Sequence, residues 1–195
     1  MNENLRAPAD AASDAARLLG RIETLLPKDV EGNFLAFKPG ATGAEEKSDV
    51  VHDFLAFLAE QMIEMKKQKR GGMKRFLGWL VKQLRISPDS KGNEGLEALT
   101  GKTRLRNYLG DYQKGEERLS FDDLLAILQK NRSRIRASLS DPAFVAGLRS
   151  GYESSLARLL PIKERLAKTD WLIDQVVYRL YGLTEDEIKV VEGAV

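Results

Sequence analysis

The chain contains no cysteine and only one histidine, His52, so it can form neither disulfides nor the multi-cysteine and multi-histidine sites that hold zinc. No run approaches the roughly 18 uninterrupted apolar residues of a membrane-spanning helix. The first residues show no apolar run behind a basic cluster, so no secretory signal is expected. We therefore expect a cytoplasmic protein that uses no metal or cofactor and has no membrane association.

Common catalytic motifs are also missing. The sequence contains no Gly-x-Ser-x-Gly turn, no phosphate-binding P-loop and no dinucleotide-binding glycine fingerprint. Any Ser–His–Asp triad would need His52, which lies at the start of a predicted helix beside an apolar stripe, as structural histidines do. We expect no catalytic residue and no enzymatic activity in this chain.

What the sequence does have is helical periodicity. Hydrophobic residues make up 43% of the 195 residues and recur at three- and four-residue steps, whereas no alternating strand pattern is comparably strong. We predict an all-α fold: an irregular multi-helix bundle with a long antiparallel helical pair and a loop-rich middle. The predicted helices cover residues 9–26, 48–84, 120–135, 142–166, 169–181 and 184–192.

Capping residues and helix breakers define these segments. The predicted N-caps are Ser48, Ser120, Asp141, Thr169 and Thr184, and Gly182 is the expected left-handed residue after a helix. Gly71-Gly72 is expected to break or kink the second helix, because each glycine costs a helix about 1 kcal/mol relative to alanine. Pro161 is expected to kink its helix rather than end it.

The domain organisation follows from the glycines and prolines of residues 27–48, which predict a loop with a short strand or turn near Phe34–Phe37. This loop separates an N-terminal arm, residues 1–47, from a helical domain, residues 48–195.

The net charge of +2 hides a strong asymmetry along the chain. Residues 1–65 carry 6 Lys and Arg against 12 Asp and Glu, residues 66–136 carry 18 against 8, and residues 137–195 carry 7 against 9. A basic middle third indicates an anionic partner, because lysine and arginine neutralise phosphates without reading base sequence. The candidate DNA-backbone-binding residues are Lys66, Lys67, Lys69, Arg70, Lys74, Arg75, Lys102, Arg104, Arg106, Lys130, Arg132, Arg134 and Arg136.

The residues alone allow two interpretations of this basic region. The cations either contact phosphates or form a solvated surface beside acidic neighbours in the same chain. Trp79 and Trp171 lie on apolar stripes, so we expect them in the core rather than stacked on bases.

Several segments resemble a known family. They are Phe54–Met62, Phe76–Leu80, Leu99–Thr103, Tyr108–Tyr112, Leu119–Leu125 and, most specifically, Thr169–Gly193 (TDWLIDQVVYRLYGLTEDEIKVVEG). Together they resemble the C-terminal helical region of large bacterial adenine-specific DNA methyltransferases, including type IIG restriction–modification enzymes and related phage-defence enzymes. The resemblance covers about residues 50–195 and leaves the N-terminal arm unexplained.

The resemblance implies a non-catalytic role. In such enzymes this region supplies helices that flank the DNA and hold the domains together. Asp141-Pro142-Ala143-Phe144 departs from the family's base-flipping motif because alanine replaces its second proline, and helix capping explains these residues better. The family's cofactor loop and nuclease motif are also missing, so no catalytic residue is carried over.

Two functional hypotheses result. The first is a helical module of a restriction–modification or phage-defence methyltransferase, contacting the DNA backbone, docking on the enzyme body, or both. The alternative is a protein–protein interaction module without a nucleic-acid role, forming a homodimer through the apolar stripes of Val50–Leu84.

Overall fold

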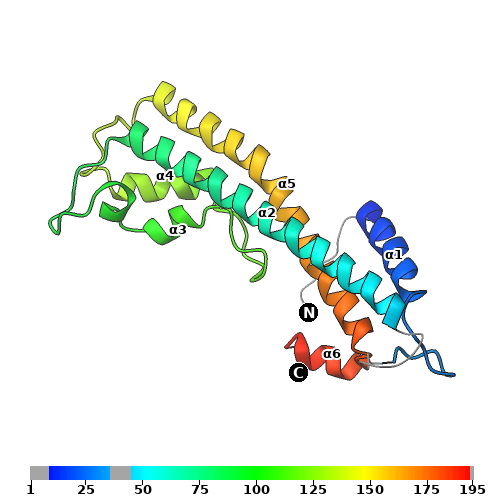
Figure 1. The fold of residues 1–195 in the computed structure, drawn as a ribbon. Coiled ribbons are helices and arrows are strands. Elements are labelled where there is room, and N and C mark those ends of the chain that lie inside the picture. The colour runs from blue at the N-terminus through cyan, green and yellow to red at the C-terminus, as the bar shows by residue number, and fades with distance from the viewer. Residues whose placement is uncertain (1–8, 36–44, 194–195) are drawn as a thin grey trace. The chain divides into compact units, whose positions relative to one another are not determined.

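The computed structural model describes residues 9–35 and 45–193, which form six α-helices and confirm the predicted all-α fold (Figure 1). The helices are α1 (Ala9–Glu23), α2 (Glu45–Leu84), α3 (Lys102–Arg106), α4 (Phe121–Lys130), α5 (Pro142–Leu180) and α6 (Glu185–Val191), with a 3₁₀ turn, η2, at Gly95–Ala98. Within the described ranges there is no strand, and extended segments pair only at isolated bridges. None of the helices described is long and apolar enough to cross a bilayer.

The chain divides into two compact units. Unit 1 contains α1, the turn that follows it, α2 as far as Glu64, α5 from Ala167 onward, and α6. Unit 2 runs from Met65 to Leu166 and includes the predicted loop-rich middle, where only η2 and α3 interrupt the loops between α2 and α4. The boundary expected after residue 47 falls inside unit 1 in this division.

The turn after α1 is the described part of the loop expected at residues 27–48; residues 36–44 lie outside the described ranges. Lys28 and Phe34 pair in an isolated bridge around a tight turn. Within it Asp29 accepts hydrogen bonds from the backbone N–H groups of Glu31 and Asn33 and from the Asn33 side chain. The expected short turn is therefore present.

Helix α2 departs from two expectations. It begins at Glu45, so Ser48 lies inside its first turn and is not the N-cap. It also continues through Gly71-Gly72, so the helix does not break at these two glycines. Within unit 2 a side chain at position 72 would meet Leu159 of α5, with 2.4 Å between the added Cβ and a Leu159 methyl carbon. The glycine thus permits close helix packing, which outweighs its low helix propensity.

Helix α5 is a single helix where two were predicted. It continues from Pro142 to Leu180 through Pro161 and past Thr169, so Thr169 is a helix-interior residue and its prediction as an N-cap was wrong. The apolar stripe explains the continuity, because buried Leu166 leads directly to Leu172 and no glycine intervenes.

The remaining caps are confirmed. Ser120 accepts a hydrogen bond from the Asp123 N–H at 3.0 Å, and Asp141 accepts one from the Ala143 N–H at 2.9 Å. Thr184 forms a reciprocal capping box with Glu187 at the start of α6. Gly182 has a φ of 62° and ends α5, where Leu183 N–H reaches back to the Tyr178 carbonyl at 2.9 Å.

Helix α4 ends at Lys130, five residues before the predicted end at Ile135. The buried Asn131 side chain stops it by turning to the loop before α3. Its amide donates to the carbonyls of Thr100 and Ile127 at 2.9 and 2.8 Å, and its oxygen accepts from Thr100 N–H at 2.9 Å.

In unit 2, α3 and α4 lie beside the second part of α2 and the first part of α5 (Figure 1). Residues of these four helices form a core rich in aromatic rings. The predicted antiparallel pair is present here: Gly72 lies against Leu159, whereas Trp79, further along α2, lies against the earlier Gly151. Phe76 contacts the ring of Tyr108, with centroids 4.8 Å apart. Burial raises the pKa of Tyr108 to about 12, although its hydroxyl is hydrogen-bonded to Ser155 at 2.6 Å.

Unit 1 has a smaller and mostly aliphatic core. Its buried members are Leu19, Ile22, Leu26, Val51, Leu58, Leu172, Val176 and Leu180. Beside this core Arg179 donates to Glu23 at 2.7 Å and ties α5 to α1.

Candidate nucleic-acid interface

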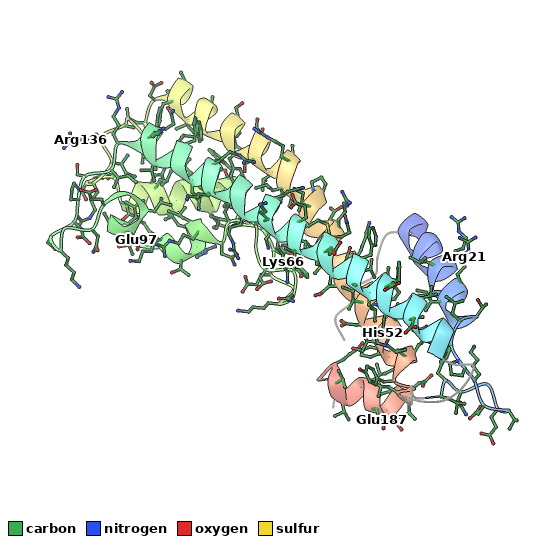
Figure 2. The ribbon with its side chains drawn as sticks, in the orientation of Figure 1. Arg21, His52, Lys66, Glu97, Arg136 and Glu187 are labelled. Carbon is green, nitrogen blue, oxygen red and sulfur yellow. The ribbon has the colours of Figure 1, made fainter. Side chains whose placement is uncertain are left out.

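The thirteen candidate cations all lie in unit 2, whose residues 65–166 carry 22 Lys and Arg against 11 Asp and Glu. The first six candidates lie on the part of α2 that follows Glu64. The next three, Lys102, Arg104 and Arg106, lie on α3. The last four begin at Lys130, the final residue of α4, and continue into the segment after it. Figure 2 labels Lys66 and Arg136, the first and last of the candidates, and Glu97, an acid among them. Figure 2 also labels Arg21, His52 and Glu187 of unit 1, where none of the candidates lies.

An open groove of about 810 Å³ runs along α2 in this unit. Its basic lining residues are Lys66, Lys69, Arg70, Lys74, Lys82 and Arg106. Its apolar floor is formed by Met73, Leu77, Val81 and Leu96. Positions 66, 70, 73, 74, 77 and 81 follow the three- and four-residue spacing of one helix face, so the uninterrupted helix through Gly71-Gly72 is what aligns them.

Only two acids, Glu97 and Asp111, line this groove, and Glu97 is already paired with two cations. Glu97 lies 3.0 Å from the Lys102 ammonium and also contacts the Arg106 guanidinium. The other, Asp111, accepts a hydrogen bond from the backbone N–H of Gln113. Outside the groove Arg104 lies 3.7 Å from Asp123. These exposed pairs are worth about 0–1 kcal/mol each, so a phosphate can replace the carboxylate without a large loss of stability.

Most of the other candidates keep their charge available. Lys66, Lys67, Arg70, Lys74, Arg75, Lys130 and Arg132 are exposed, and no ion pair links them to an acid within the described ranges. Lys69 is half-buried, with its ammonium 5.6 Å from the centre of the Tyr112 ring.

Arg134 and Arg136 do not line the groove. They lie in the segment after α4, which pairs with the segment after α2. Arg134 donates to the Pro88 carbonyl at 3.4 Å and Arg136 donates to the Ser87 hydroxyl at 3.1 Å. Both partners are neutral, so the positive charge of the two guanidiniums is not cancelled by these bonds.

Lys163 was not among the candidates although it contributes to the same positive field. It extends from α5 to the loop before α4, where it donates to the carbonyls of Leu109 and Glu116 at 2.7 and 2.8 Å. Burial lowers the pKa of Lys163, and the nearby Lys69 lowers it further. Its sequence signal is weak, because an isolated lysine on a helix normally remains in solvent.

Lys82 and Arg85 were also outside the candidate set, although both belong to the acid-free stretch that begins at Lys66. Lys82 lines the groove, whereas Arg85 follows the last residue of α2. Charge counting alone could have included both residues. The sequence does not show that Lys82 lines a groove, because residues from other segments, such as Leu96 and Arg106, form the rest of its lining.

His52 and Asp141 lie outside the groove in the described part of the structure. No group of three His, Cys, Asp or Glu side chains there could hold a metal ion. His52 is exposed on α2. Asp141 is engaged in capping α5, which agrees with the capping interpretation of Asp141-Pro142.

The two tryptophans differ. Trp79 is half-buried against the core of unit 2, as expected. Trp171 is 46% exposed, so its prediction as a core residue was wrong. It lies one position before Leu172, which takes the inward place on the helix in unit 1.

No protein-family model, no curated protein and no solved structure matches this chain.

Proposed function

We propose that this chain is a non-catalytic helical module that binds the phosphate backbone of DNA through unit 2. The observation that carries the proposal is the groove along α2, where six cations face two acids. One of these acids is engaged by Lys102 and Arg106, so the remaining charge of the groove is strongly positive. Such a surface attracts phosphates electrostatically and releases their counterions on binding.

The test is a fluorescence anisotropy titration of a labelled DNA duplex with the full chain over a range of salt concentrations. Each phosphate contact contributes about −0.9 to the slope of log affinity against log salt. The double variant Arg70→Gln, Lys74→Gln should bind more weakly and show a slope shallower by about 1.8.

A matched control removes the same charge from unit 1. Arg21→Gln with Lys168→Gln lowers the net charge equally, and both residues lie outside the groove. We expect this control to retain the slope of the unchanged chain. Equal losses in both double variants would mean that net charge, rather than the groove, attracts the DNA; absence of binding at low salt would reject the function.

We further propose that the module works with an adenine-specific DNA methyltransferase or restriction–modification enzyme. The support is the sequence resemblance of residues 50–195. Neighbouring reading frames test this: a methyltransferase gene beside this one supports the proposal, and its consistent absence counts against it. Co-purification with that enzyme, retained at high salt, would identify the docking partner.

A second candidate, homodimerisation, is favoured by one observation in unit 1. Much of the apolar stripe of Val50–Leu84 is buried within the chain, but Val50 and Phe57 are 53% and 54% exposed. They are seven residues apart and therefore lie on the same face of α2. A second copy of the chain could cover this face. Light scattering should then give twice the monomer mass, and Phe57→Glu should return the protein to a monomer; a monomer at all concentrations removes this candidate.

A further inference from the structure

Arg85 has an unusual backbone conformation at the end of α2. Its φ is +49°, and it is the only residue other than glycine with a positive φ in the described part of the chain. Glycine is the usual residue after a helix in this conformation, because a side chain there is strained by its own backbone. Arg85 therefore carries a backbone strain that glycine would avoid, and such strain is found most often at functional sites.

The backbone around Arg85 is held by the segment that follows α4. Ala137 N–H donates to the Leu84 carbonyl at 3.3 Å, Arg136 N–H to the Arg85 carbonyl at 3.4 Å, and Ser87 N–H to the Arg134 carbonyl at 2.8 Å. Carbonyls at the end of α2 are thereby satisfied, and the two segments are fixed in antiparallel register.

This register separates apolar from basic side chains. Ile86 and Ile135 are opposite each other in the bridge, and both pack into the core of unit 2. Arg85 and Arg136 flank this pair on opposite segments, and both are exposed. Directly opposed like charges destabilise paired segments, so the arginines here add an electrostatic cost to the strain at Arg85.

No carboxylate within the described residues forms an ion pair with these arginines. Arg136 and Arg134 bond to the Ser87 hydroxyl and the Pro88 carbonyl, and Asp89, the nearest acid in sequence, accepts hydrogen bonds from Lys91 and Asn93. The Arg134 charge lies close enough to help lower the pKa of Asp89, after the hydrogen bonds from Asn93. Three arginines therefore flank one bridge, and Asp89, the acid close to Arg134, forms no ion pair with any of them in the described part of the chain.

We propose that Arg85, Arg134 and Arg136 form a second phosphate-binding point, distinct from the groove, which grips one phosphodiester group of the bound nucleic acid. This inference rests on the proposed DNA-backbone function and adds Arg85 to its binding residues. Guanidinium groups suit this task because their planar set of donors matches phosphate oxygens. Holding the three arginines at this bridge lowers the stability of the fold, through the backbone strain at Arg85 and the repulsion between Arg85 and Arg136.

Arg85→Gly separates this role from a structural one. Glycine relieves the positive φ, so the melting temperature should rise by about 2–4 °C, the usual response of a protein this size to a modest gain in stability. The same substitution should weaken binding of the DNA duplex about 3- to 10-fold at low salt and make the salt slope shallower by about 0.9. Arg85→Lys keeps the charge and should retain the slope, whereas Arg136→Gln should lose about as much slope as Arg85→Gly.

The outcomes distinguish the two proposals. If Arg85→Gly binds DNA with unchanged affinity and slope while Arg70→Gln, Lys74→Gln loses both, the second phosphate point is wrong and the groove function stands. If the unchanged chain binds no duplex, both fail. A gain in stability accompanied by a loss of binding in Arg85→Gly is the result that supports the inference.

Discussion

Units 1 and 2 share the two long helices but differ in charge and in surface. Unit 2 carries 22 Lys and Arg against 11 Asp and Glu, while the rest of the chain carries 9 against 18. The exposed large hydrophobic residues show the reverse distribution. All of them belong to unit 1: Val30, Leu35, Val50, Phe57, Ile63, Trp171, Tyr181, Val190 and Val191.

The difference teaches that one pair of helices can serve two kinds of surface. Within the described ranges, the basic unit has no large apolar side chain among those that are highly exposed, and its open groove is lined by six cations. The acidic unit instead leaves several large apolar side chains exposed to solvent. The two cores also differ in polarity. The two buried polar residues of the described structure, Asn131 and Ser155, are both in unit 2.

The largest expected effect tests the aromatic core of unit 2. Phe76→Ala removes a ring that contacts Tyr108 and Tyr152, with centroids 4.8 and 5.9 Å apart. We expect a loss of about 3–5 kcal/mol in the free energy of unfolding. Urea unfolding followed by Trp79 fluorescence in a Trp171→Phe background measures it, since each unit contains one tryptophan. An unchanged Trp79 transition would show that the aromatic cluster is not what stabilises this unit.

Asn131 gives the next largest effect. Asn131→Leu removes three hydrogen bonds and leaves the backbone groups of Thr100 and Ile127 without their side-chain partner. The expected loss is about 2–3 kcal/mol, because unsatisfied buried polar groups are costly. The exposed Ser154→Ala is a control that should change stability by less than about 0.5 kcal/mol. If both variants unfold at the same urea concentration, the clamp between α4 and the loop before α3 has no energetic importance.

A smaller effect is expected at the ion pair of unit 1. Arg179 donates to Glu23 at 2.7 Å, and the two side chains are only 23% and 30% exposed. Arg179→Gln should cost about 1 kcal/mol at low salt. The difference from the unchanged chain should shrink as salt screens the pair, which thermal unfolding at two salt concentrations would measure. A loss that does not depend on salt would point to packing of the arginine stem instead.

The smallest effect concerns two matching turns, one in each unit. Asp29 and Asp89 each accept hydrogen bonds from the residues two and four positions later, within the shared pattern Asp-x-x-Gly-Asn. Hydrogen bonds from Asn33 and Asn93 respectively are the main causes that lower the pKa of each carboxyl below its usual value of 3.8.

A lowered folded-state pKa means that each turn is stabilised above pH 3.8 and loses this stabilisation as the pH falls through the folded-state pKa. NMR titration of the carboxyl carbons should give values below 3.8 for both residues, with the same direction in the two units. Asp89→Asn should abolish the pH-dependent stabilisation of the turn in unit 2 and leave that of the Asp29 turn in unit 1 unchanged. A titration at or above the usual value would contradict the turn geometry.

Local signals in the sequence predicted much of this structure. The all-α class, the caps at Ser120, Asp141 and Thr184, and the left-handed Gly182 depend on residues close together in the chain. Counting charge along the chain also identified Lys66, Lys69, Arg70 and Lys74, four of the cations that line the groove.

The errors have a common cause. Thr169 and Gly71-Gly72 carry sequence signals for helix ends, yet both lie inside long helices. In unit 2 the apolar partners across the helix pair, such as Leu159 against Gly72, compensate for weak local propensity. The exposure of Trp171 was missed for a related reason, because periodicity gives the apolar face but not how far a neighbour covers it.

By itself, the sequence determined the helical class, the sites of several caps and turns, and the concentration of positive charge in the middle of the chain, since each depends on side chains acting on their immediate neighbours. Only the tertiary structure decided which cations share a groove, that Glu97 takes up Lys102 and Arg106, and that Arg85 and Arg136 lie opposite each other. These juxtapositions join residues from separate segments, and packing of the apolar faces brings them together.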